Sequence, residues 1–269
     1  CRSAIEPNIV ENAANIKRHI IQNNIYGVDI ERGAVDIARL RFWLSLIVDE
    51  KSPEALPNLD FKIMQGNSLL EQYKGADLAT MTEKKVGGQG VTIFDSMLDV
   101  YRKNLRDKLT EYYACPEHDK KVQLRKDIAD IVKKELSEQG INIDFGDIDM
   151  SANNQFFLWH TWFHDIFSRP SKEGFDIVIG NPPYGAKYDN ETKRYYKNTY
   201  VTANSIRGLQ KGSLDTYTLF IELGYNLLRR DGSFAYIVPI SLTSSDSLTG
   251  VHRILMGNCD TIHISSYAV

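Results

Sequence analysis

Short apolar runs that end at polar residues, alternating with helical patterns, constrain the fold of this chain more than any other feature. The clearest runs are residues 25–30, 61–64 and 175–179. Apolar residues recur on one broad helical face over residues 33–50. The run at 175–179 is almost continuously apolar, as in central parallel strands that are covered on both faces. This alternation predicts an α/β fold with a mostly parallel sheet and helices on both of its faces.

The same pattern divides the chain into three parts. Residues 1–70 and 171–269 carry the alternating runs, whereas residues 71–170 have few strand-like runs and a charge-laced helical segment over about 95–139. We expect the middle part to be a mainly helical insertion, built as a helical hairpin and docked onto the domain by the aromatic segment 156–167. The further elements that we expect are helices at 215–229 and 247–256 and strands at 233–238 and 261–265.

Composition excludes several classes of protein. The 269 residues are 42% apolar and 25% charged, as in globular proteins, and no apolar run reaches the roughly 18 residues of a membrane span. The three cysteines lack paired spacing, so they predict neither a disulfide framework nor a zinc knuckle, and they indicate a reducing, cytoplasmic setting. The chain begins with Cys1 and shows no secretion signal, so we expect a piece of a longer polypeptide.

A net charge of -3 means that any contact with nucleic acid must rest on a local patch. Such a patch follows Tyr184, where residues 185–212 hold six basic and two acidic side chains with tyrosines between them. One interpretation is a surface for phosphate contacts and base stacking, and the other is a mobile charged loop. The basic residues are Lys187, Lys193, Arg194, Lys197, Arg207 and Lys211.

Asp29 closes the first apolar run directly before a helix. A carboxylate in this position can accept hydrogen bonds from both hydroxyls of a ribose, or it can serve as a helix cap or a loop carboxylate. A nucleotide site would also need a glycine-rich loop before the strand. The only candidate, Gly88-Gln89-Gly90, has no strand in front of it. The loop is therefore either absent or encoded before Cys1.

The sequence Asn181-Pro182-Pro183-Tyr184 follows the third apolar run and is the most specific signal in the chain. Two consecutive prolines fix the backbone and cannot donate hydrogen bonds, so their carbonyl groups remain as acceptors. Together with the Asn181 side-chain oxygen, these acceptors can hold an amino group, and Tyr184 offers a flat face for stacking. The alternative interpretation is a rigid turn in which a proline and the tyrosine stack.

The segment from Phe175 to Tyr184 resembles the target-amine motif of class I S-adenosylmethionine-dependent amino-methyltransferases. Most closely, the chain resembles the DNA adenine-N6 methyltransferase part of type IIG restriction-modification enzymes. The resemblance implies a Rossmann-like fold, S-adenosylmethionine as methyl donor, and an adenine flipped out of double-stranded DNA as the acceptor. It also implies further domains of the same polypeptide as partners, namely a target-recognition domain after this chain and the cofactor loop before it.

The resemblance assigns roles to individual residues. Asn181 and the prolines Pro182 and Pro183 would hold the target amine, and Tyr184 would stack on the flipped base. On the cofactor, the family places a ribose contact at Asp29 and adenine-packing residues at Ile30 and Phe220. Asn67 and Ser68, after the second run, would complete this site, although the family usually has an aspartate at the position of Asn67. The histidines lack metal spacing, so no metal is expected.

Two other functions remain open at this point. Protein-glutamine N5 methyltransferases use the same Asn-Pro-Pro-Tyr sequence on a protein amide, but they normally lack a large insertion before it and a basic aromatic loop after it. A degenerate, non-catalytic DNA-binding or scaffold piece would be consistent with Asn67 and with the missing glycine-rich loop. We expect the DNA adenine methyltransferase.

Overall fold

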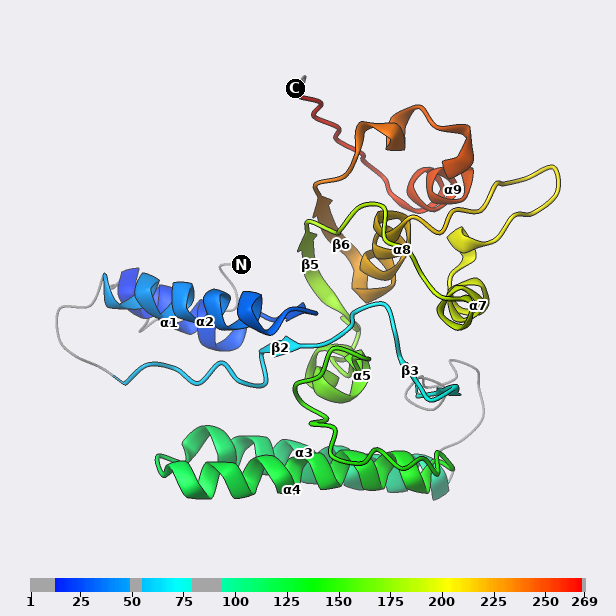
Figure 1. Cartoon of the computed structure of the whole chain (residues 1–269). Helices are drawn as coiled ribbons and strands as arrows, with labels where there is room; N and C mark the ends of the chain where they lie inside the picture. The colour runs from blue at the N-terminus through cyan, green and yellow to red at the C-terminus, as the bar shows by residue number, and fades with distance from the viewer. Residues whose placement is uncertain (1–12, 49–54, 79–92, 268–269) are drawn as a thin grey trace. The chain divides into compact units, whose positions relative to one another are not determined.

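The computed structural model describes residues 13–48, 55–78 and 93–267, which belong to two compact units divided after Trp162 (Figure 1). No helix within these ranges is both long and apolar enough to cross a membrane. The first unit contains α1 (Ala13–Asn23), β1 (Gly27–Asp29), α2 (Arg32–Ile47), β2 (Ile63–Gln65), β3 (Gln72–Tyr73), β4 (Ala76–Asp77), α3 (Ile93–Ala114), α4 (His118–Glu138) and α5 (Trp159–Trp162). The second contains α6 (His164–Phe167), β5 (Phe175–Gly180), α7 (Asn190–Thr199), α8 (Thr216–Leu227), β6 (Leu228–Tyr236), α9 (Thr249–Asn258) and the short 3-10 helices η3 (Val201–Ala203), η4 (Ile240–Thr243) and η5 (Asp246–Leu248).

In the first unit, β1 and β2 pair in parallel and α2 connects them. Asp29 lies opposite Gln65, so the carboxyl ends of the two strands meet at one edge. The inner face of α2 packs Val35 and Leu46 into a core with Ile63. The expected parallel α/β pairing is thus present in this part of the chain.

The other face of α2 is apolar as well, but it is exposed. Ile37, Leu40, Leu44 and Ile47 follow each other at helical spacing and are each 50–59% exposed. The broad apolar face that the sequence predicts over residues 33–50 is therefore only half buried within this unit. Helix α2 ends at Ile47.

The expected helical hairpin is present as α3 and α4, which lie side by side in Figure 1. A stripe of buried side chains lines the inner face of α4, namely Leu124, Ile128, Val132 and Leu136. Asp60 anchors the hairpin to the strand region: the Tyr112 hydroxyl donates to its carboxylate at 2.5 Å, and Arg39 from α2 pairs with it at 3.1 Å. The Phe61 ring stacks on Trp162 and meets the edge of Tyr112, so Phe61 links the aromatic segment to the hairpin.

In the second unit, β5 and β6 pair in parallel, with Val178 opposite Phe234 and Gly180 opposite Tyr236. Phe234 and Tyr236 pack against a core built from α8, η5 and α9, which includes Ile221. Helix α8 is buried nearly all round, which explains why residues 215–229 carry so many apolar side chains.

Two expectations for this unit are wrong. Strand β5 is not covered on both faces within it, because Ile177 and Ile179 are 63% and 77% exposed; among the described residues β5 pairs only with β6, and only one face meets α8. Residues 261–265 form no strand either. They are exposed and find no pairing partner in the described part of the chain.

Candidate functional site

The Asn-Pro-Pro-Tyr segment leaves the carboxyl end of β5 and is held there by its neighbours. Pro182 is buried, whereas Asn181 and Tyr184 are exposed. At the other end of β5, Asp176 forms ion pairs with Arg169 and Arg229. The hydrogen bonds from these arginines, Arg229 first, hold the pKa of Asp176 below its usual range. The strand that presents the segment is thus fixed at both ends.

Gly180, the last residue of β5, allows a close approach that no other residue would. A Cβ atom at this position would lie 2.9 Å from the ring of Tyr236, and one at Gly224 of α8 would lie 2.4 Å from the hydroxyl of the same tyrosine. Tyr236 therefore fills the space between β5 and α8, and burial raises its pKa to about 12. The packing of the Tyr236 ring therefore positions the end of β5, which directly precedes Asn181.

Tyr184 is half exposed, and its hydroxyl lies within hydrogen-bond distance of two oxygen atoms. The hydroxyl lies 3.2 Å from the side-chain oxygen of Asn181 and 3.0 Å from the carbonyl oxygen of Ile237, just after β6. The ring meets that of Tyr217 edge-on, at 6.2 Å between centroids. The structure thus brings Asn181 and Tyr184 into contact at the end of β5.

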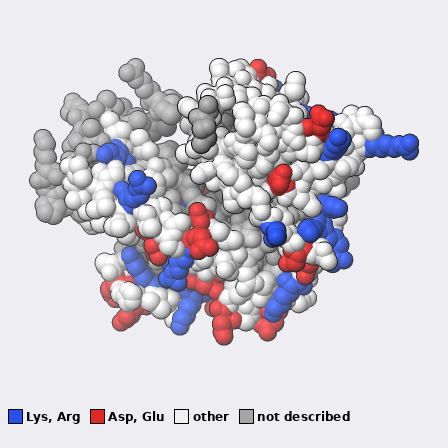
Figure 2. Space-filling view, turned by 45° about the horizontal axis from the view of Figure 1, so that its top comes forward, with Lys and Arg blue, Asp and Glu red and all other residues white. Residues whose placement is uncertain are grey.

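The basic segment 185–212 is not a mobile loop, which corrects one of the two interpretations. It contains α7 and η3, and Asp189 caps α7 by accepting from the Thr192 N–H at 2.7 Å. That hydrogen bond is the main reason why the pKa of Asp189 is lowered. The side chains of the six basic residues are all exposed. Figure 2 shows that basic and acidic side chains are interleaved over the face in view rather than gathered in one stripe.

A buried carboxylate fastens this segment to the unit. Glu222 of α8 is only 4% exposed, and it accepts hydrogen bonds from the Val201 and Thr202 N–H groups at 2.8 Å and from the Thr202 hydroxyl at 2.6 Å. Gln210, also buried, donates to the Val201 carbonyl at 3.0 Å. Sequence reasoning missed Glu222, although an acidic residue on an otherwise apolar helical face was a usable signal.

The tyrosines of the segment do not offer free faces for bases. Tyr195, Tyr196 and Tyr200 are buried and pack against one another, and Tyr188 meets Tyr196 edge-on at 4.9 Å. Burial raises the pKa of Tyr196 strongly. The sequence interpretation of these rings as stacking residues is therefore wrong, because they form the hydrophobic underside of α7.

The predicted cofactor residues of the first unit lie at the adjacent ends of β1 and β2. Asp29 accepts from the Glu31 N–H at 2.8 Å, so one carboxylate oxygen takes part in the local turn that leads into α2. Ile30 is 45% exposed beside it. The Asn67 side-chain oxygen accepts from the Leu69 N–H at 3.3 Å.

Two aromatic residues that sequence reasoning did not single out for this site cover the turn after β2. A Cβ atom at Gly66 would lie 2.4 Å from the ring of Phe157, so only glycine fits there. The indole of Trp159 donates to the carbonyl of Ser68 at 3.0 Å. Phe220, the remaining predicted cofactor residue, is half-buried on α8 and belongs to the second unit.

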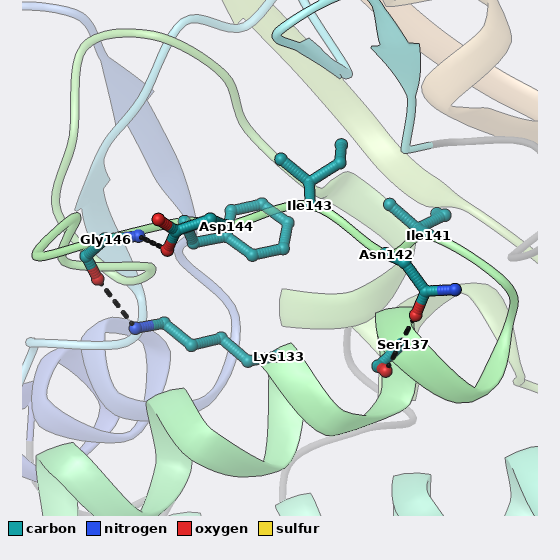
Figure 3. Close-up of a pocket in the computed structure, with 8 residues that line it drawn as sticks. Lys133, Ser137, Ile141, Asn142, Ile143, Asp144 and Gly146 are labelled. Atoms are coloured by element: carbon teal, nitrogen blue, oxygen red, sulfur yellow. Dashed lines mark hydrogen bonds between the residues drawn. The ribbon is translucent and has the colours of Figure 1, made fainter.

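The cavity in Figure 3 lies elsewhere in the first unit. Its lining side chains come from the end of α4 and the turn that follows, and the Lys133 amine donates to the carbonyl of Gly146 at 3.3 Å. None of the predicted site residues lines it.

Comparison with known proteins shows relatives that include the following two. A protein of Methanocaldococcus jannaschii, named as a type II restriction enzyme and methyltransferase, is 25% identical over 84% of this chain. A type II methyltransferase of Thermus thermophilus is 38% identical over 76 residues, or 25% of this chain. The matched parts are 22% and 16% of the respective relatives, so this chain spans only a small part of their length.

A family model describes nearly the whole chain. The model of the Eco57I restriction-modification methylases matches residues 23–268, which include β1, β2, β5 and the Asn-Pro-Pro-Tyr segment. This chain belongs to the Eco57I restriction-modification methylase family.

Proposed function

We propose that this chain transfers the methyl group of S-adenosylmethionine to N6 of adenine in DNA, within a restriction-modification system. The main support is the end of β5, where the exposed Asn181 and Tyr184 flank the buried Pro182 in a segment tied to β6. The side-chain oxygen of Asn181 and the carbonyl of Pro182 are hydrogen-bond acceptors, which suit an amino group with two hydrogens. The adenine must leave the helix to reach them, because its amino group is otherwise paired.

The residues of the chain act on the target by positioning it. The side-chain oxygen of Asn181 and the carbonyl of Pro182 accept the two amino hydrogens, which favours the tetrahedral nitrogen whose lone pair can attack. The Tyr184 ring, half exposed beside Asn181, stacks on the extruded base. The nitrogen then forms a bond to the methyl carbon as the bond from that carbon to sulfur breaks, which leaves S-adenosylhomocysteine, and the nitrogen loses one hydrogen as a proton to solvent. This displacement needs alignment of the nitrogen with the methyl carbon and no covalent intermediate with the protein.

S-adenosylmethionine supplies a methyl group on a positively charged sulfur, which makes that carbon an electrophile. The first unit has residues that fit the nucleoside part of this molecule. Asp29 is an exposed carboxylate at a strand end, and next to it Ile30 exposes 45% of its surface, which an adenine ring would cover. We assign Asn67 and Ser68 to the same ligand, within a Rossmann-like sheet. Phe220, on α8 of the second unit, keeps the adenine-packing role that the resemblance gives it.

The basic side chains of residues 185–212 contact DNA phosphates in this proposal. They are exposed, and most of them lie on or beside α7, directly before the η3 residues that Glu222 holds. Phosphate contacts orient a protein on the duplex without reading its sequence, so the specificity of the reaction must come from other groups.

The test is transfer of a labelled methyl group by the full-length protein. Unmethylated bacteriophage DNA is incubated with protein and methyl-labelled S-adenosylmethionine, and the digested nucleosides are separated. We expect the label in N6-methyldeoxyadenosine, and its loss with Asn181→Ala. Label in methylcytosine, or in the glutamine of a protein substrate, would refute the adenine assignment.

A further inference from the structure

The hydroxyl of Tyr184 lies between two oxygen atoms, and it can satisfy only one of them as a donor. It is 3.0 Å from the Ile237 carbonyl oxygen and 3.2 Å from the side-chain oxygen of Asn181. A phenol carries a single hydrogen, but its oxygen can also accept a hydrogen bond. If one of these two neighbours accepts the hydroxyl hydrogen, the other can form a hydrogen bond with Tyr184 only by donating to the hydroxyl oxygen.

The two neighbours differ in what they can offer. The carbonyl of Ile237 only accepts, and its position is fixed, because the Ile237 N–H donates to the Gly180 carbonyl at 3.1 Å. The carboxamide of Asn181 can present either its oxygen or its NH2 group to the same partner by a half-turn about its last bond. Only the amide of Asn181 can adapt to the hydroxyl.

Extending the proposed function, on which this inference rests, we propose that the Tyr184 hydroxyl orients the Asn181 amide for the target amine. In the complex with DNA the hydroxyl donates to the Ile237 carbonyl and accepts from the NH2 group of Asn181. The amide oxygen of Asn181 then points away from Tyr184 and accepts a hydrogen from the target amino group. In this arrangement the Tyr184 hydroxyl, the Asn181 NH2 group and the target amine each donate to a different acceptor.

The structure has the side-chain oxygen of Asn181 toward the hydroxyl, and keeping this orientation would work against the reaction. If the hydroxyl donated to the Asn181 oxygen, it would compete with the target amine for that acceptor. The NH2 group of Asn181 would then face the substrate, and two donors would meet. Tyr184 thus has two separable functions: its ring contacts the base, and its hydroxyl positions Asn181.

Tyr184→Phe separates the two functions, because it keeps the ring and removes the hydroxyl. In the full-length protein, with both substrates saturating, we expect the single-turnover methylation rate to fall about five- to tenfold, as for one lost neutral hydrogen bond. The KM for DNA and the fluorescence of 2-aminopurine at the target position should stay unchanged. Tyr217→Phe is the matched control, since it removes a neighbouring hydroxyl that lies 3.3 Å from the Ser241 oxygen.

A second pair of variants tests whether the hydroxyl acts through Asn181. In the Asn181→Ala background, Tyr184→Phe should cause no further loss, because the amide that it positions is gone. An equal loss in both backgrounds would overturn the inference, and so would an unchanged rate for Tyr184→Phe alone. A faster rate would mean that the hydroxyl competes with the target amine, which also overturns it. No methylation by the wild type would instead refute the proposed function.

Discussion

The buried carboxyl group of Glu135, on the inner face of α4, should make the stability of the helical hairpin depend on pH. Its side chain is 3% exposed and accepts from the Gln139 amide at 3.4 Å. Within the described part of the chain, its second carboxyl oxygen has no hydrogen-bond partner. Burial raises the pKa of Glu135 from 4.5 to about 7, and the charge of Arg102 offsets this only in part.

The folded chain therefore keeps a proton that the unfolded chain releases between pH 4.5 and about 7. The free energy of unfolding should fall as the pH rises through this range and level off above it, because the folded state must then bury a charge. At about 1.4 kcal/mol per pH unit, the loss amounts to about 3 kcal/mol. Glu135→Gln removes the titration and keeps the shape of the side chain. The variant should thus be about 3 kcal/mol more stable than the wild type at pH 8.5, and equally stable at pH 4.5.

Urea unfolding followed by far-ultraviolet circular dichroism at both pH values measures this difference, and hydrogen exchange of the α4 amides assigns it to the hairpin. Glu138→Gln, on the exposed side of the same helix, is the control and should change little. If the wild type and Glu135→Gln lose stability in parallel between pH 4.5 and 8.5, the argument from burial is refuted.

Four further predictions concern the second unit. Asn181→Ala should slow single-turnover methylation about 10² to 10³-fold with DNA binding intact, since one preorganised acceptor is lost; a near-normal rate would exclude its role. Tyr184→Ala should weaken capture of the extruded base by about 1–3 kcal/mol, measured with 2-aminopurine, and Tyr184→Trp should preserve it. Lys193→Ala should weaken DNA binding equally for all sequences, and it should lower by about one the slope of log binding constant against log salt concentration. Lys126→Ala on α4 is the control and should leave this slope unchanged. An unchanged slope for Lys193→Ala would show that α7 does not contact DNA. Glu222→Gln should cost about 1–3 kcal/mol in thermal unfolding, because the amide cannot accept all three hydrogen bonds; unchanged stability would contradict this.

Local sequence patterns predicted β1, β2, β5 and β6, and the polar residues at the ends of the first, second and third of these strands. Asp29, Asn67 and Asn181 each follow a short apolar run, and each lies at or just after the carboxyl end of a parallel strand. Such positions depend on neighbouring residues alone, because apolar length and the prolines after residue 181 fix where a strand stops. The hairpin α3–α4 followed from its charge and apolar periodicity for the same reason.

Features that depend on distant partners escaped prediction. Residues 185–212 looked like a loop because α7 is short, and its position depends on Glu222, which comes later in the chain. The tyrosines looked available for stacking because a sequence does not show that Tyr196 faces other tyrosines. The exposure of Ile177 was not predicted either, because an apolar run shows that a strand is hydrophobic but not which of its two faces is covered.

Helix α8 carries three consequential residues within a little more than one turn. Phe220 is assigned to the cofactor, Glu222 holds the basic segment, and Gly224 leaves room for the Tyr236 ring that supports the end of β5. A helix of this length moves as one rigid body, so none of these three groups can shift without the other two. Cofactor contact, DNA contact and amine placement would therefore be coupled through α8 in the proposed function.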